Sequence, residues 1–237
     1  MKSFYTLLLA SMVSLSVSAQ NVDADKARTA QNKALRDSLS KATEVLAYHP
    51  DSIDLRLKKA AWNIQLAQWQ YAKDDLDKVL FLNNTNIAGL FYRAFVNEKL
   101  LRYNFARLDY QNLLVLVPGN FQAQLGLALL NEKDKHYTEA YDGINSLIEQ
   151  YPDSAMAYAA RGGMEKERGM LELAEFDYAK AMELDAGNED FAFNHVDILI
   201  LLGRKDEAYR DLKKLLDAGC QPGRLQGFYA RLKKKKK

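Results

Sequence analysis

Apolar side chains recur along this chain at the spacing of an amphipathic helix, and the whole pattern returns every 34 residues. In each copy an alanine is followed by apolar residues four, seven and eight positions later. This spacing places one stripe on a single face of a helix, which a β-strand could not do. The pattern predicts a repeat protein built from helices. The five marking alanines are Ala72, Ala106, Ala140, Ala174 and Ala208.

A second set of columns lies half a copy earlier and predicts another helix in each copy. Residues that favour a helix N-cap recur on the same grid, and small residues that let two helices pack closely follow them. The cap column is Ser52, Asn86, Asn120, Ser154 and Asn188, and the small column is Ala60, Ala94, Ala128 and Gly162, with Val196 in the fifth copy. Gly169 and Gly203 mark the turn between the two helices in the last two copies, because glycine takes the left-handed cap readily.

A 34-residue helix–turn–helix unit with these small-residue columns resembles the tetratricopeptide repeat. Tyr103 and Tyr137, just before the second helix, and Pro118 and Pro152, at its end, carry the likeness further. The resemblance implies an all-α fold, a right-handed α-solenoid of five repeats with a capping helix at each end. It also implies that the first helices line a concave surface where ligands bind.

The predicted repeats cover the middle of the chain. Their ranges are 52–85, 86–119, 120–153, 154–187 and 188–221. Residues 20–51 are predicted to form a half repeat that covers the first unit, and residues 222–237 a capping helix followed by a lysine tail. Terminal units of such arrays differ from the rest because one of their faces meets water.

Residues 1–19 have the features of a cleaved signal peptide. Lys2 precedes an apolar run that is shorter than the roughly 20 residues of a membrane-spanning helix, and small residues at Val17-Ser18-Ala19 suit a signal peptidase. A buried N-terminal helix is the alternative. We expect an exported protein that begins near Gln20 and resides in the periplasm, with secretion and association with the outer membrane left open, and no stable transmembrane segment after cleavage.

Charge and motif content favour binding over catalysis. The sequence has 33 basic and 31 acidic residues, and because Lys2 and five tail lysines are among the former, the predicted body is mildly acidic. It shows no basic stripe for nucleic acid. The single cysteine, Cys220, excludes an internal disulfide. The three histidines form no i,i+4 pair and no catalytic motif is present, so we expect no metal, no cofactor and no enzyme. Most acidic residues are taken as solvated.

The predicted partner-binding groove lies on the first helices of the second and third repeats. Phe91 and Phe95, one turn apart, are either anchors for a bound segment or side chains that fill the seam between units. The matching tripeptides 97–99 and 131–133 place asparagines that either hold a peptide backbone or bond to their own turn. The predicted site residues are Phe91, Phe95, Asn97, Glu98, Gln122, Leu125, Leu129, Asn131 and Glu132.

The function expected from this surface is that of a non-catalytic adaptor of the cell envelope, which binds a protein or peptide segment in its groove. The alternative is an accessory protein that binds carbohydrate or cell wall, whose aromatic side chains stack on sugar rings. Pairing of two copies of the chain is left open.

Overall fold

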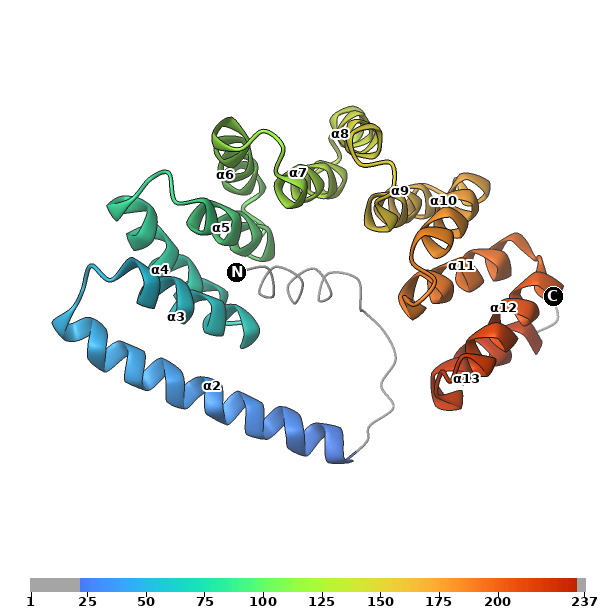
Figure 1. Cartoon of the computed structure of the whole chain (residues 1–237), viewed down its shortest axis with the longest axis horizontal. Helices are drawn as coiled ribbons and strands as arrows, with labels where there is room; N and C mark the ends of the chain where they lie inside the picture. The colour runs from blue at the N-terminus through green and yellow to red at the C-terminus, as the bar shows by residue number, and fades with distance from the viewer. Residues whose placement is uncertain (1–21, 234–237) are drawn as a thin grey trace. The chain divides into compact units, whose positions relative to one another are not determined.

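The computed structural model describes residues 22–233, and every regular element in that part of the chain is a helix (Figure 1). Twelve helices follow one another there, most of them as helix–turn–helix pairs. The all-α prediction is therefore confirmed. The predicted signal peptide, residues 1–19, and the tail lysines 234–237 lie outside the described residues.

Ten of the described helices form five hairpins, and one further helix stands at each end of the series. Helix α2 (Val22–Tyr48) precedes the hairpins and α13 (Pro222–Lys233) follows them. The hairpins are α3 (Ile53–Gln65) with α4 (Trp69–Leu82), α5 (Ile87–Lys99) with α6 (Tyr103–Leu116), α7 (Phe121–Lys133) with α8 (Tyr137–Gln150), α9 (Ala155–Glu167) with α10 (Leu171–Leu184), and α11 (Glu189–Leu202) with α12 (Lys205–Asp217).

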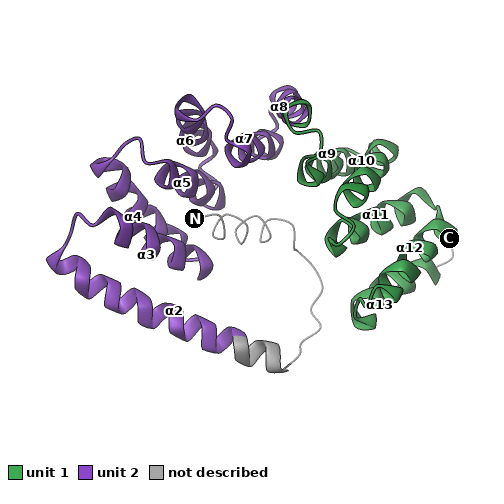
Figure 2. Ribbon diagram, in the orientation of Figure 1, with its two compact units in different colours: residues 1–20, 148–237 green, residues 21–147 purple. Residues whose placement is uncertain are grey.

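The chain divides into two compact units, whose described parts are residues 22–147 and 148–233 (Figure 2). The division falls inside α8, after Leu147. The N-terminal unit holds α2 to α7 and most of α8, and the C-terminal unit holds α9 to α13. No helix in the described part of the chain has the length and apolar character needed to cross a bilayer.

The small-residue columns lie where the helices of each hairpin meet. All five second-helix alanines are fully buried, and Ala60, Ala94 and Ala128 on the first helices are at most 1% exposed. Glycine allows a still closer approach at Gly126 of α7, where a Cβ atom would lie 2.7 Å from the ring of Tyr110 on α6. Large apolar side chains fill the remaining space, and each contributes roughly 1.5–3 kcal/mol to stability when fully buried.

The N-cap column acts as predicted in four of the five hairpins. The side chains of Asn86 and Asn120 accept hydrogen bonds from the backbone N–H three residues on, at 2.8 and 2.9 Å. Ser154 does the same at 3.2 Å, and Asn188 caps the N–H two residues on at 3.1 Å. Ser52 precedes α3 with the extended backbone of a cap, but its side chain makes no capping hydrogen bond.

All five turns between paired helices use a left-handed residue, although the sequence indicated this only for the two glycines. The positive φ angles are 55° at Ala67, 58° at Leu101, 63° at Lys135, 74° at Gly169 and 78° at Gly203. After each turn residue, the next N–H bonds to a carbonyl five residues back, as Arg102 does to Asn97 at 2.8 Å. This is the hydrogen bond of a Schellman cap. Helix termination thus holds three non-glycine residues in an unfavourable conformation.

Replacing Leu101 with glycine is expected to raise the free energy of unfolding by roughly 0.5–1 kcal/mol. A left-handed conformation costs an L-residue about 1–2 kcal/mol, and glycine avoids this cost. Part of the resulting stabilisation is lost because glycine has more conformational freedom in the unfolded state. Leu101 is 73% exposed, so little packing is lost. Urea unfolding measures the change. Gly203→Ala is the matched control and should lower stability by about 1 kcal/mol; a loss of stability in Leu101→Gly would contradict the strain at this turn.

Helix α13 continues the repeat grid at the end of the C-terminal unit. Leu225 and Leu232 lie 34 residues after Phe191 and Ile198, and all four side chains are buried. The ring of Phe228 stacks on Phe193 of α11 at 5.7 Å. Helix α13 therefore packs as the first helix of a further repeat.

Helix α2 has the complementary place at the other end. Ala42 and Leu46 lie 34 residues before Leu76 and Leu80, and they are 3% and 7% exposed where α2 packs on α3. Val45, which lies 34 residues before the buried Val79, is 47% exposed. Helix α2 therefore packs as a second helix without its own first helix in the described chain.

Candidate partner-binding surfaces

The predicted groove residues lie on α5 and α7 of the N-terminal unit, and most of them are buried. Seven of the nine are at most 8% exposed, and only Gln122 and Leu129 are half-buried. The seven are Phe91, Phe95, Asn97, Glu98, Leu125, Asn131 and Glu132. These side chains consequently contribute little surface that a ligand could touch.

The two phenylalanines pack within and between hairpins. The ring of Phe91 lies edge-on to Tyr110 of α6, with 6.1 Å between the centroids. Phe95 lies edge-on to Trp69 of the preceding hairpin at 6.0 Å. At 4% and 2% exposure, both rings have the environment of seam-filling side chains. Their packing is worth about 0.5–1.5 kcal/mol per aromatic pair beyond the area that it buries.

The asparagines at the ends of the first helices bond to neighbouring side chains. Asn97 donates from Nδ2 to Asp109 of α6 at 3.3 Å. Asn131 accepts from Arg107 of α6 at 3.1 Å. Both amides are thus hydrogen-bonded to the neighbouring helix α6 rather than to their own turn, while the buried Oδ1 of Asn97 has no hydrogen-bond partner.

Glu98 joins three helices of the N-terminal unit. The Tyr110 hydroxyl donates to its Oε1 at 2.7 Å, and the Lys133 ammonium of α7 donates to its Oε2 at 3.1 Å. Burial, together with the charge of Glu98, raises the pKa of Tyr110 well above its usual range. The hydroxyl therefore stays protonated and keeps donating. Because the Tyr110 ring also packs against Gly126 of α7, Tyr110 of α6 contacts both α5 and α7.

Two lysines are the exposed residues of the first helices α5 and α7. Lys99 and Lys133 occupy the same repeat position on α5 and α7, and both are exposed. Burial and the positive charge of Lys133 lower the pKa of Lys99, because the two ammonium groups repel each other. We call Lys99, Gln122, Leu129 and Lys133 the first-helix surface. The lysines were within the matching tripeptides but were not predicted as site residues.

A column of ion pairs holds the hairpins together and was not predicted. A basic side chain on each first helix bonds to an aspartate 16 residues later on the second helix, in every hairpin except α7–α8, which has Leu127 and Gly143 at these positions. The pairs are Lys59–Asp75 at 3.1 Å, Arg93–Asp109 at 2.7 Å, Arg161–Asp177 at 2.7 Å and His195–Asp211 at 2.9 Å. These aspartates are 1–8% exposed, so the expectation that acidic residues are solvated is wrong for them.

One cavity opens between the second helices α4 and α6, above α5. It encloses about 290 Å³. Charged side chains lie inside it, whereas Phe105 and Leu108 at its rim are 64% and 53% exposed. We call it the Arg102 cavity. Its lining residues are Lys73, Asp77, Arg93, Asn97, Arg102, Phe105, Leu108 and Asp109.

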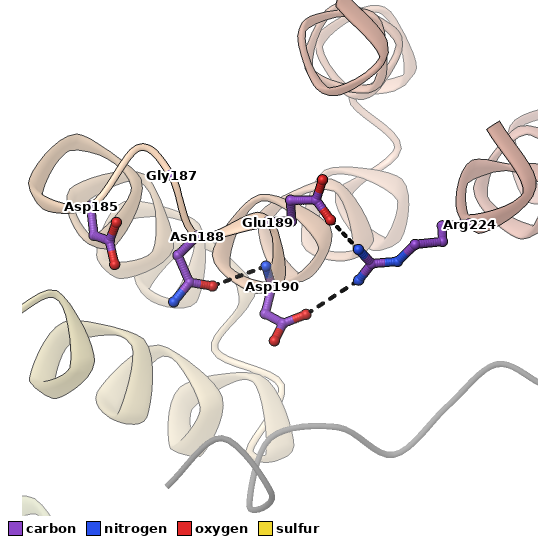
Figure 3. A pocket seen from close by; sticks show the side chains of 6 residues that line it. All are labelled: Asp185, Gly187, Asn188, Glu189, Asp190 and Arg224. Carbon is purple, nitrogen blue, oxygen red and sulfur yellow. Dashed lines mark hydrogen bonds and ion pairs between the residues drawn. The ribbon is translucent and has the colours of Figure 1, made fainter. Parts of the chain in front are cut away.

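A second cavity, of about 640 Å³, lies in the C-terminal unit and is polar (Figure 3). Asp185 and Gly187 come from the loop before α11, and Asn188 caps that helix. Arg224 of α13 reaches Glu189 and, at 3.7 Å, Asp190. The charged groups on α11 are thus paired across the cavity, and the pairs fasten α13 to α11.

Two of the described histidines contact carboxylates, and the cysteine is buried. No cluster of three or more His, Cys, Asp or Glu side chains suited to a metal ion occurs among the described residues. His195 lies between Asp211 at 2.9 Å and Glu175 at 3.3 Å. Cys220 is buried, and burial together with the charge of Glu189 raises the pKa of its thiol, which disfavours the reactive thiolate.

Comparisons with known proteins identify the fold. The chain is 21% identical to a tetratricopeptide repeat protein from Parabacteroides merdae, with a TM-score of 0.71 over 86% of this chain and 80% of that one. It is 18% identical to YrrB, described as a TPR protein with an unusual peptide-binding site, with a TM-score of 0.52 over 80% of this chain and 97% of that one. No family model matches the chain.

One curated relative is also similar in sequence. The chain is 30% identical to human sperm-associated antigen 1 over 108 residues, which is 44% of this chain and 12% of that protein. The described helices thus form a solenoid of tetratricopeptide-like hairpins, and the fold prediction is confirmed.

Proposed function

We propose that this protein is a non-catalytic adaptor that binds a segment of a partner protein on the first-helix surface of α5 and α7. The observation that carries the proposal is the pair of exposed lysines, Lys99 and Lys133, which occupy the same repeat position on α5 and α7, with the half-buried Leu129 one turn before Lys133 on α7. Glu98 already neutralises Lys133 in part, at 3.1 Å, whereas Lys99 lies over the Phe95 ring at 5.1 Å. An acidic segment with an apolar residue suits such a surface.

Two further considerations support a protein partner. YrrB, which has the same fold, is a TPR protein with a peptide-binding site of its own. In the described structure the Phe91 and Phe95 rings are buried, so nothing there favours the alternative in which they stack on sugars. The first-helix surface offers an aliphatic side chain and two ammonium groups in their place.

The cellular location belongs to the proposal as well. Residues 1–19 have the composition of a signal peptide, and on this basis we propose that the adaptor acts in the cell envelope. Mass spectrometry of the protein purified from fractionated cells tests this. A mature N-terminus near Gln20 in the exported fraction is the expected result. Full-length protein confined to the cytosol would contradict it.

A photo-crosslinking amino acid at position 122 tests the binding surface in intact cells. We expect a discrete adduct that disappears when Lys99→Glu and Lys133→Glu are introduced, because charge reversal repels an acidic segment. The matched control places the same amino acid at Asp142, an exposed position on α8 outside the first-helix surface. The proposal is wrong if the adduct survives charge reversal or forms equally from position 142.

A further inference from the structure

Arg102, which lines the Arg102 cavity, lacks the glutamate that follows the other basic residues at its repeat position. Position 102 immediately precedes the second helix, and the residues at this position in the five hairpins are Gln68, Arg102, His136, Met170 and Arg204. Three residues later the hairpins have Tyr71, Phe105, Glu139, Leu173 and Glu207. Where the residue before the second helix is neutral, the residue three positions later is aromatic or aliphatic. Where that residue is basic, the residue three positions later is glutamate, except after Arg102.

In the last hairpin this pair of positions forms an ion-pair network. Arg204 donates to both carboxylate oxygens of Glu207 at 2.6 Å, and it reaches Glu175 of the preceding second helix at 3.3 Å. His136 likewise lies 3.9 Å from Glu139. A basic side chain at this position is therefore accompanied by a carboxylate from the helix that follows it and, for Arg204, also by one from the preceding second helix.

Arg102 lacks both of these carboxylates. The residue in the place of Glu207 is Phe105, and the residue in the place of Glu175 is Lys73. The nearest acids in the cavity are already engaged: Asp77 pairs with Lys73 at 2.5 Å and with Arg93 at 3.1 Å, and Asp109 pairs with Arg93. In the described part of the chain, the Arg102 side chain makes no ion pair.

The cavity that Arg102 lines has room for side chains from a partner. Its volume of about 290 Å³ lies at the lower limit of pockets for small molecules, roughly 300–1,000 Å³. Three cations and two carboxylates line it, which leaves one positive charge in excess. Phe105 and Leu108 expose apolar surface at the rim, beside Arg102.

We propose that the Arg102 cavity binds a partner's peptide segment that carries a carboxylate side chain next to an apolar one. The carboxylate takes the place that Glu175 and Glu207 take at Arg204, where a guanidinium can bind two oxygens at once. The apolar side chain packs on Phe105 and Leu108. The inference rests on the proposed function in that the partner is a protein, but it assigns a different surface, lined by α4, α5 and α6 and distinct from the first-helix surface.

A peptide array tests this directly with the purified protein. The probes are immobilised 12-residue peptides with one Glu and one Leu in a Gly-Ser background, at every spacing from one to six residues. Each has a copy with Gln in place of Glu. We expect at least one spacing to bind tenfold or more strongly than its Gln copy, and Arg102→Ala to remove that preference.

Phe105→Glu provides the sharper variant, because it restores the carboxylate that accompanies Arg204. We expect it to abolish binding of the Glu peptides, since Arg102 then pairs within its own helix. Phe176→Glu is the control: Phe176 is also 64% exposed, lies on α10 of the other unit, and adds the same charge. It should leave binding unchanged.

Other outcomes would overturn the proposal. Equal binding of Glu and Gln copies excludes carboxylate recognition, and a dimer in solution that Phe105→Glu dissociates assigns the cavity to a second copy of the chain. If no peptide binds while the adduct at position 122 forms, this inference fails and the proposed function stands. If peptides bind through Arg102 while position 122 forms no adduct, the first-helix proposal fails and this inference stands.

Discussion

Replacing Arg93 with leucine is expected to lower the free energy of unfolding by about 3 kcal/mol. Arg93 binds both carboxylate oxygens of Asp109, at 2.9 and 2.7 Å, and Asp109 is only 2% exposed. Without the guanidinium, a buried charge keeps only the amide of Asn97 as partner, and breaking a buried pair in this way typically costs about 3–5 kcal/mol. Urea unfolding followed by far-ultraviolet circular dichroism measures the loss.

The third hairpin suggests the compensating variant. It has Leu127 and Gly143 where the second has Arg93 and Asp109, so the fold tolerates a hairpin without this pair. Arg93→Leu combined with Asp109→Ala should therefore recover at least about 2 kcal/mol of the loss, because no unpaired charge remains. Arg102→Leu, at an exposed arginine without an ion pair, is the control and should change stability by less than about 0.5 kcal/mol. A double variant no more stable than Arg93→Leu would show that buried charge is not the cause.

Replacing Glu165 with glutamine is expected to stabilise the protein by roughly 3 kcal/mol above neutral pH. Glu165 is 5% exposed, and its Oε2 has no hydrogen-bond partner. Burial and the charge of Asp177 raise its pKa to about 7. Each pKa unit corresponds to about 1.4 kcal/mol, and the ionised form is the one that the folded state disfavours. Glutamine keeps the shape of the side chain without this charge.

The sign of the pH dependence follows from the raised pKa. Stability from the protonated Glu165 is fully present below the ordinary pKa of 4.5 and is lost as pH rises through about 7. Unfolding in urea at pH 5 and pH 8 should therefore show that Glu165→Gln removes roughly 2 kcal/mol of the difference between the two conditions. The same repeat position holds Asn97 and Asn131, so an amide fits there. An unchanged pH difference in the variant would contradict the assignment.

The helices and their caps could be predicted from the sequence because each depends on residue types that recur on one grid. The left-handed turns at Ala67, Leu101 and Lys135 could not, since none of these residues favours that conformation and the helix–helix geometry imposes it. For glycines at 169 and 203 the local signal and the final conformation coincide.

Binding residues were harder to predict than the fold. Phe91 and Phe95 have the same spacing whether they face a ligand or a neighbouring hairpin, and only tertiary packing distinguishes the two. The aspartates of the second helices recur in the sequence 16 residues after basic residues of the first helices, and this spacing could have predicted the pairs. Considered one by one, the aspartates were expected to be solvated. Arg102 is detectable in the same way, by comparing the residues three positions later in each repeat.

The linkage made by Tyr110 has a consequence for how the adaptor would recognise its ligand. Its ring rests on Gly126 and its hydroxyl bonds to Glu98, so a hinge motion between α5 and α7 would require breaking a buried hydrogen bond. The spacing of Lys99 and Lys133 is consequently set before any ligand arrives. A preformed spacing avoids the entropy cost of ordering these side chains on binding. Affinity should therefore depend on how well the acidic groups of the ligand match the fixed spacing of the two lysines.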